Sequence, residues 1–122
     1  MEHTTYVPDP YSRNCPSRQL LDRIGDRWTV LLVGVLSTGP HRFNELQRKV
    51  DGISQKMLTQ TLRNLERDHI VHREVYPESP PRVEYSLTEA GRSLCGPLKS
   101  LEMWAVAHYQ AMHGEDSPLL FP

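Results

Sequence analysis

The segment from Ile53 to Arg67 constrains the fold of this chain more than any other part of the sequence. It places three leucines within about 40° of one another on a helical wheel of about 100° per residue: Leu58, Leu62 and Leu65. Ser54 is suited to cap the N-terminus of such a helix, and Asp51-Gly52 before it is typical of a tight turn. The sequence therefore predicts an amphipathic helix that enters from a turn and buries its leucine face.

The opposite face of this helix is polar, cationic and without an acidic side chain. It holds Lys56, Thr59, Gln60, Arg63 and Arg67, with Gln55 at its edge. Arginine and lysine can donate hydrogen bonds to guanine, glutamine can pair with adenine, and threonine can contact phosphate or a thymine methyl. The helix N-terminus at Ser54 offers N–H groups to a phosphate. An ordinary solvated face is the alternative, and it is the commoner one for a single helix.

The rest of the chain supplies the context that favours nucleic acid. We expect helices over 16–24, 28–36 and from Asn44 to Val50, a short extended piece or turn at 42–43, strands over 70–77 and 82–87, and a long last helix capped by Thr88. Two helices joined by a tight turn and followed by a hairpin form a winged helix-turn-helix. The predicted fold is thus mainly α with a small β-hairpin, over 15–113, between tails at 1–14 and 114–122.

Two further elements beside the central helix are candidates for contact with DNA. Arg82 at the hairpin tip would reach the minor groove or its flanking phosphates, although Glu78 and Glu84 nearby would repel phosphate. An ordinary surface hairpin with an incidental arginine is the alternative. Arg42 and Asn44, at the start of the preceding helix, are candidates for phosphate contacts.

Composition excludes several other classes of protein. The 122 residues carry a net charge of −1, but residues 42–82 hold eight Lys or Arg against six Asp or Glu. No apolar run of about 18 residues is present, and the N-terminus lacks the apolar core of a signal peptide, so we expect a cytoplasmic protein without a membrane span. We find no phosphate loop, nucleophile elbow or paired-carboxylate motif, and therefore expect neither an enzyme nor a cofactor. The six histidines lack a neighbouring cysteine pair, which argues against a metal site.

The sequence resembles the HxlR family of winged-helix regulators, relatives of the MarR group, over about residues 15–108. The resemblance rests on Cys15-Pro16, IGDRWTVLLVGVLSTGPHRFNELQRKV from Ile24, GISQKMLTQTLRNLE from Gly52, VYPESPPRVEYSLTEAGRSL from Val75, and Leu101-Glu102-Met103-Trp104. The chain departs from the family pattern in its 14-residue leader and in His69, which stands where glycine is common.

The resemblance implies a homodimer joined by the N- and C-terminal helices, with one recognition helix for each half-site of a near-palindromic DNA operator. The expected interface residues are Leu20, Leu94, Leu98, Leu101 and Trp104. Packing of the last helix into the core of its own chain is the alternative for this stripe, and one stripe can serve both purposes. A winged helix that contacts only other proteins is the rival function.

Cys15 is a candidate redox or electrophile sensor. It precedes Pro16 at a helix N-terminus, a position that stabilises a thiolate, and a cysteine at this position is a thiol sensor in some members of the family that the chain resembles. A structural cysteine in a regulator with another small-molecule effector is the alternative. We expect Cys95 to be buried, and a Cys15–Cys95 bridge has no support from their spacing. A thiol enzyme would need a positioned base, which the sequence does not provide.

Overall fold

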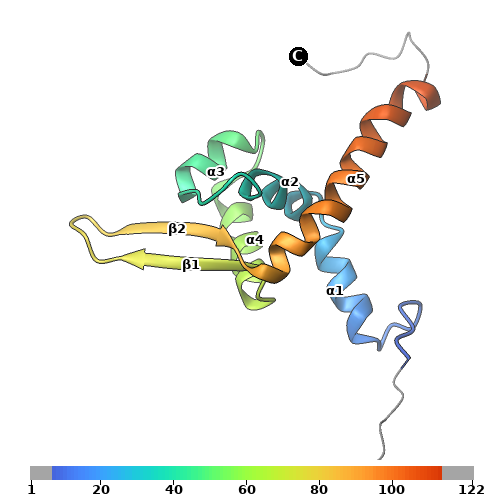
Figure 1. The fold of residues 1–122 in the computed structure, drawn as a ribbon, viewed down its shortest axis with the longest axis horizontal. Helices are drawn as coiled ribbons and strands as arrows, with labels where there is room; N and C mark the ends of the chain where they lie inside the picture. Colours follow the sequence, from blue (N-terminus) through green and yellow to red (C-terminus); the bar gives the residue numbers. More distant parts are fainter. Residues whose placement is uncertain (1–6, 114–122) are drawn as a thin grey trace, which may run out of the picture.

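The structure is a computed structural model of the chain, and it describes residues 7–113. These residues form five helices and one hairpin, in the order α1 (Pro16–Ile24), α2 (Arg27–Leu36), α3 (Phe43–Lys49), α4 (Gln55–Arg67), β1 (Val71–Tyr76), β2 (Arg82–Leu87) and α5 (Glu89–His113). The hairpin projects to one side of the helices, while α1 and the end of α5 extend away on the other side (Figure 1). The predicted winged helix-turn-helix is confirmed. The predicted tail 114–122 and residues 1–6 lie outside the described part.

The turn between α3 and α4 forms as the sequence predicts. Gly52 has a φ of 89°, a left-handed conformation that glycine adopts without strain. The Ser54 hydroxyl accepts a hydrogen bond from the Met57 N–H at 3.0 Å and so caps α4. Helix α3 begins at Phe43 rather than Asn44, because the Glu45 carboxylate accepts the Arg42 N–H at 2.8 Å and closes the first turn one residue earlier.

The predicted extended piece or turn at 42–43 is right for Arg42, which is extended with a φ of −89° and a ψ of 161°, and wrong for Phe43, which is already helical. The extended segment instead includes His41, which forms a single bridge with Tyr85 of β2. The His41 N–H donates to the Tyr85 carbonyl at 2.9 Å, and the Tyr85 N–H donates back at 2.8 Å. This bridge ties the loop before α3 to the hairpin, so that the first helix of the pair and the wing are fixed to each other.

Helix α4 ends in a left-handed turn at His69, whose φ is 60°. The Ile70 N–H donates to the Leu65 carbonyl at 2.9 Å, which is the bond that closes a Schellman motif. Glycine adopts this conformation most easily, so histidine holds a backbone position that normally favours glycine. The chain leaves α4 directly into β1 as a result.

The two strands pair antiparallel in a register that gives the hairpin two distinct faces. One face holds the cross-strand pairs Val71–Leu87, Arg73–Tyr85 and Val75–Val83, and the other holds His72–Ser86, Glu74–Glu84 and Tyr76–Arg82. The predicted common face of Val83, Tyr85 and Leu87 is thus confirmed. Val71 and Leu87 are buried at the end of the hairpin that joins the helices, so the first face is turned toward the core there.

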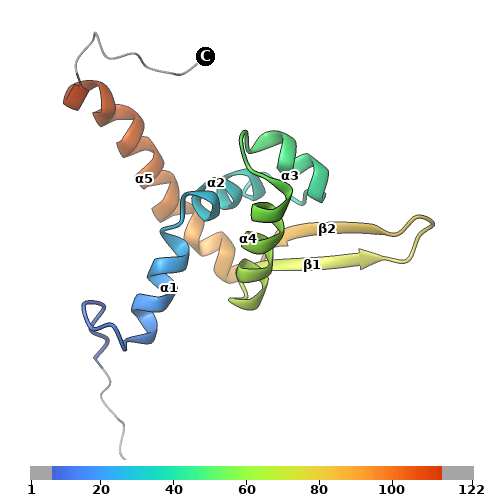
Figure 2. The same ribbon diagram turned by 180° about the vertical axis from the view of Figure 1, so that it is seen from behind.

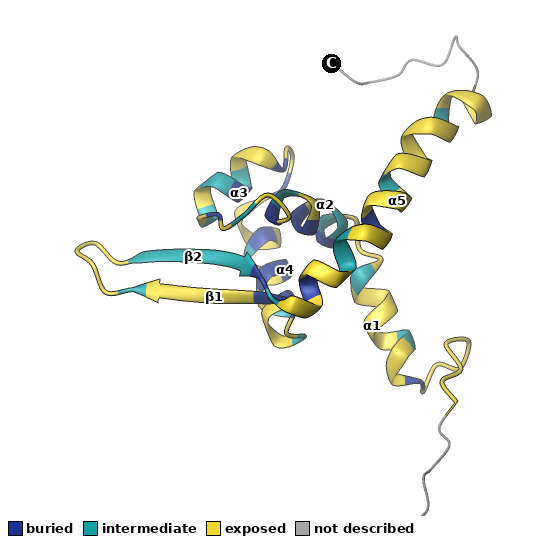
Figure 3. Cartoon of the chain, in the orientation of Figure 1, coloured by how far each residue is buried: buried dark blue, intermediate teal, exposed yellow. Residues whose placement is uncertain are grey.

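The hydrophobic core lies where α2, α3, α4 and the hairpin base meet (Figure 3). Its most deeply buried side chains are Leu32, Leu46, Leu58 and Leu65. Helix α5 joins this core through its first turns, and Gly91 lies so close to β1 that a Cβ there would be 2.3 Å from the Ile70 carbonyl oxygen. The side chain of Thr88 caps α5 by accepting the Gly91 N–H at 3.1 Å.

The predicted interface stripe has a buried part and an exposed part in the single chain. Leu98 is only 7% exposed and packs in the core of its own chain, with Leu94 partly buried against the same core. Leu101 and Trp104 are each 53% exposed, and Leu20 on α1 is 42% exposed. The stripe divides because α5 leaves the core after its third turn (Figure 3). Within residues 7–113 no helix is long and apolar enough to cross a membrane.

Candidate nucleic-acid interface

Helix α4 lies alongside the base of the hairpin (Figure 2). Its leucine face packs against the core. Leu58, Leu62 and Leu65 are buried as predicted, and Thr61 is buried with them. The polar side chains predicted to face outward are exposed, namely Gln55, Lys56, Gln60, Arg63 and Arg67. Thr59 is half-buried, because it sits on the side of α4 that is turned toward the hairpin.

The exposed cations of α4 differ in how far other side chains engage them. The Arg67 guanidinium donates to the Asn64 side-chain oxygen at 3.5 Å, and the Gln60 amide donates to the same oxygen at 3.4 Å. Lys56 and Arg63 make no side-chain hydrogen bond or ion pair with any residue of the described part. Two cationic groups on this face are therefore available to an anionic partner.

The predicted absence of acid from this face is wrong at its edge. A hollow of ≈ 310 Å³ separates α4 from the hairpin base, and its lining residues are Phe43, Thr59, Leu62, Arg63, Glu66, Arg73 and Tyr85. Glu66 is exposed and lies one helical turn from Arg63 and Leu62, on the side of Thr59. The acid was missed because it falls just outside the arc of the wheel that the other polar residues occupy.

The start of α3 and the hairpin tip enclose a second hollow, of ≈ 600 Å³. Its lining residues include Arg42, Asn44, Glu45, Arg48, Pro81 and Arg82. The structure thus brings together two predicted phosphate contacts, Arg42 and Asn44, with the predicted wing residue. Hydrogen bonding to the Arg42 N–H lowers the pKa of the Glu45 carboxyl, and the nearby charges of His41, Lys49 and Arg48 add to that effect against opposing desolvation.

Arg82 is held by its own hairpin. Its guanidinium forms ion pairs with Glu78 at 3.0 Å and Glu84 at 2.5 Å, and it stacks 3.9 Å from the centre of the Tyr76 ring. The hydrogen bond to Glu78, followed by that to Glu84, raises the pKa of Arg82 further above its ordinary value. One cation and two carboxylates leave the tip with a net negative charge, so Arg82 reaches a phosphate only by exchanging these partners.

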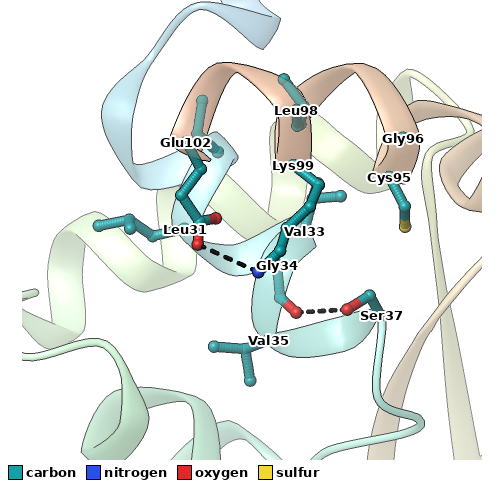
Figure 4. Close-up of a pocket in the computed structure, with 11 residues that line it drawn as sticks. Leu31, Val33, Gly34, Val35, Ser37, Cys95, Gly96, Leu98, Lys99 and Glu102 are labelled. Carbon is teal, nitrogen blue, oxygen red and sulfur yellow. Dashed lines mark hydrogen bonds and ion pairs between the residues drawn. The ribbon is translucent and has the colours of Figure 1, made fainter. Parts of the chain in front are cut away.

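Cys15 and Cys95 occupy separate places, and no disulfide joins them. Cys15 is the N-cap residue of α1 and is only 5% exposed. Cys95 is half-buried, and its thiol donates to the Gly91 carbonyl at 3.7 Å. Cys95 also lines a largely apolar hollow of ≈ 580 Å³ between α2 and α5 (Figure 4). Lys99 and Glu102 form an ion pair at its rim, at 3.6 Å.

Comparison with known proteins decides the family. The HxlR-like helix-turn-helix model matches residues 23–113. The chain belongs to the HxlR-like family of helix-turn-helix transcriptional regulators. This HxlR-like chain is 44% identical over 94 residues to the HTH-type transcriptional regulator YtfH of Escherichia coli, which covers 77% of the chain and 75% of that protein.

Solved structures of relatives share the fold. The HxlR-like chain superposes on ytfH from Salmonella typhimurium with a TM-score of 0.81 and 39% identity, over 87% of this chain and 95% of that one. It superposes on the oxidised form of the redox regulator HypR with a TM-score of 0.71 and 47% identity, over 76% of this chain and 96% of HypR. The sequence-based assignment to the HxlR family is confirmed.

Two cations of this HxlR-like interface were missed by the sequence analysis. Arg73 lines the hollow beside Arg63, and Arg48 lines the hollow beside Arg82. The alternation of β1 could have found Arg73, since it shares a face with Val71 and Val75, both apolar. Nothing in the pattern of α3 marks Arg48, because only the position of the folded wing brings it close to the hairpin tip.

Proposed function

We propose that the protein binds double-stranded DNA in the cytoplasm as a homodimer, with one α4 in each half-site of a near-palindromic operator. The observation that carries this proposal is the pair of exposed, unengaged cations Lys56 and Arg63 on the helix beside the wing. A recognition helix in this fold enters the major groove, where such side chains donate to base edges and phosphates. The HTH-type regulators to which the chain is similar support the same function.

The proposed contacts divide by what they would touch. Lys56, Thr59, Gln60, Arg63 and Arg67 face the major groove, whereas Ser54 and Gln55 present the N-terminus of α4 to a phosphate. Arg42 and Asn44 bind the backbone at the start of α3. Arg82 contacts DNA at the wing tip by exchanging Glu78 and Glu84 for phosphate, and it therefore contributes less than an unengaged arginine.

Dimerisation is supported by the apolar side chains that α1 and α5 leave exposed. They are Leu20, Leu21, Leu101, Met103, Trp104 and Val106. Several large apolar side chains left exposed on two helices are typical of surfaces that bind another protein. A net charge of −1 also means that a single copy has little long-range attraction to DNA, so two reading faces are needed for tight binding.

A salt titration tests the proposal. We would measure binding of the purified protein to its own upstream DNA by fluorescence anisotropy, because contacts with phosphate release counterions and make affinity fall steeply with salt. Arg63→Ala should cost about 1–3 kcal/mol if Arg63 reads a base. Arg13→Ala, an exposed arginine before α1, is the matched control and should bind like the wild type. Binding that is absent or insensitive to salt would refute DNA binding and favour a protein–protein module.

We further propose that thiol chemistry at Cys15 controls this binding, an idea supported by the similarity to the redox regulator HypR. Because Cys15 caps α1 and is almost fully buried, its modification would have to disturb the start of the helix that the dimer uses. Limiting alkylation near neutral pH, followed by mass spectrometry, should label Cys15 faster than a thiol in a denatured control. Cys95→Ser should keep the response of DNA binding to a thiol oxidant, and Cys15→Ser should lose it. A response retained in Cys15→Ser would leave a separate effector as the regulator.

A further inference from the structure

The arginine at the tip of the hairpin is paired with acidic side chains, whereas the arginine at its base is not. At the tip, Arg82 is engaged by Glu78, Glu84 and the Tyr76 ring, so its charge is cancelled within the hairpin. At the base, Arg73 is exposed and makes no side-chain hydrogen bond or ion pair with any residue between 7 and 113. The wing therefore offers its available cation at the base, beside α4, and not at the tip.

The surroundings of Arg73 suit an anion. Arg73 shares the hollow of ≈ 310 Å³ with Arg63 of α4, and the two guanidinium groups outnumber the single carboxylate of Glu66 there. The side chains of Thr59 and Tyr85 line the same hollow, and each carries a hydroxyl that can donate a hydrogen bond. Two arginines, two hydroxyls and one acid thus give the hollow a net positive charge between the recognition helix and the wing.

We propose that Arg73 binds a backbone phosphate of the half-site that α4 reads, so that the hairpin base is the main contact between the wing and DNA. The inference rests on the proposed DNA binding and deepens it by naming the contact. A phosphodiester carries one negative charge and oxygens that a guanidinium fork can bind through two parallel hydrogen bonds. Because Arg63 lines the same hollow, a phosphate held by Arg73 would fix the position of Arg63 over the neighbouring bases.

This contact is independent of base sequence, which separates it from the reading face of α4. Phosphate contacts set register and orientation, whereas contacts with base edges discriminate between sequences. Loss of Arg73 should therefore weaken binding to cognate and random DNA alike. Loss of a base-reading residue should weaken binding to the cognate DNA alone.

The experiment compares the salt dependence of DNA binding in two variants, one changed at the base of the hairpin and the other at its tip. Arg73→Gln removes the base cation and keeps most of its alkyl stem. The double variant Arg82→Gln with Glu84→Gln removes the tip cation together with one of its carboxylates, so that the net charge of the tip is unchanged. Each would be titrated against its upstream DNA and against a random duplex of about 30 base pairs, long enough for two half-sites about one helical turn apart.

We expect Arg73→Gln to make the negative slope of log K against log salt shallower, by about 0.9 for each bound protomer. Affinity for both duplexes should fall on the order of tenfold for each bound protomer near ~0.1 M salt. Arg73→Lys, which restores the charge without the fork, should restore the slope, and the double tip variant should change it less than Arg73→Gln does. Equal melting temperatures would exclude unfolding as the cause.

The outcomes separate the inference from the proposed function. If the wild-type protein shows no salt-dependent binding to either duplex, the DNA-binding function itself is overturned. If the wild type binds but Arg73→Gln keeps its slope and affinity, the inference alone fails. A larger loss of slope in the double tip variant than in Arg73→Gln would place the main wing contact at Arg82 and would also overturn it.

Discussion

Glu45 shows how one side chain can set where α3, the first helix of the helix-turn-helix, begins. Its carboxylate accepts the Arg42 N–H at 2.8 Å, and that bond is the main cause of its lowered pKa. Three positively chargeable neighbours act in the same direction, namely His41, Arg48 and Lys49. A carboxyl whose pKa is lower in the folded chain than in the unfolded chain stabilises the fold while it is ionised.

The stabilisation by Glu45 should depend on pH in a defined direction. Because the folded pKa lies below the unfolded one, the contribution is complete above the ordinary glutamate value and disappears as pH falls through the lowered value. Glu45→Gln should therefore melt below the wild type at pH 7, and the two melting temperatures should converge in acid. Thermal denaturation followed by circular dichroism from pH 7 to about pH 3 measures this convergence. A constant gap across that range would contradict it.

At the scale of elements, the join between the hairpin and α5 depends on a close approach of the backbone at Gly91. The Thr88 hydroxyl donates to the His69 carbonyl at 2.6 Å and also accepts the Gly91 N–H, so it links the end of α4 to the start of α5. Gly91 lies against β1 with no space for a side chain. The orientation of α5 relative to α4 and the hairpin is thus fixed in the first turn of α5.

Gly91→Ala should destabilise the fold even though alanine is the better helix former. The new Cβ would meet the Ile70 carbonyl oxygen at 2.3 Å, and the helix or the strand would have to shift. Overpacking of this kind costs about 1–3 kcal/mol, more than the gain of about 1 kcal/mol in helix propensity. Gly96→Ala is the matched control in the same helix, since nothing lies within 4 Å of its added Cβ. Urea denaturation should separate the two, and equal stability of both variants would refute the close approach.

Local chemistry explains which elements the sequence predicts well. Pro16 and Gly25 delimit α1, Ser54 caps α4, and the alternation from Arg82 to Leu87 matches β2, because each of these features acts between neighbours in the chain. The bridge at His41 depends on Tyr85, more than forty residues away, and the sequence analysis did not include His41 in the extended piece. Long-range contacts leave no periodic pattern.

The candidate site divides in the same way. The leucine face of α4 and its exposed cations follow from helical spacing alone. The engagement of Arg82 by two carboxylates, the place of Arg73 beside Arg63, and the presence of Glu66 in that hollow follow from how the hairpin folds against α4. Whether a surface cation is paired with a carboxylate depends on its neighbours in three dimensions. The sequence analysis therefore identified cations such as Arg82 but not the acidic groups that engage them.

At the scale of the whole molecule, the proposed dimer should depend on the part of α5 beyond the core. Leu101→Ala and Trp104→Ala should each remove about 2 kcal/mol or more of association free energy, the cost typical of anchor residues that an interface buries, and the test combines them in one double variant. Sedimentation velocity should then show monomers at concentrations at which the wild type is dimeric. Ser100→Ala, which changes an exposed polar residue of the same helix outside the proposed apolar interface, is the control and should remain dimeric. A dimeric double variant would place the interface elsewhere.

Helix α1 contributes no buried side chain to the fold of a single chain. Its position depends instead on its C-terminal end, where Ile24 packs partly against the core and Arg23 forms an ion pair with Asp68 at the end of α4. In the proposed homodimer, the partner copy would stabilise this helix, so the order of α1 should depend on the concentration of the protein. A cell with few copies would hold loosely arranged chains, and each doubling of expression would raise the number of assembled regulators more than twofold until pairing is complete.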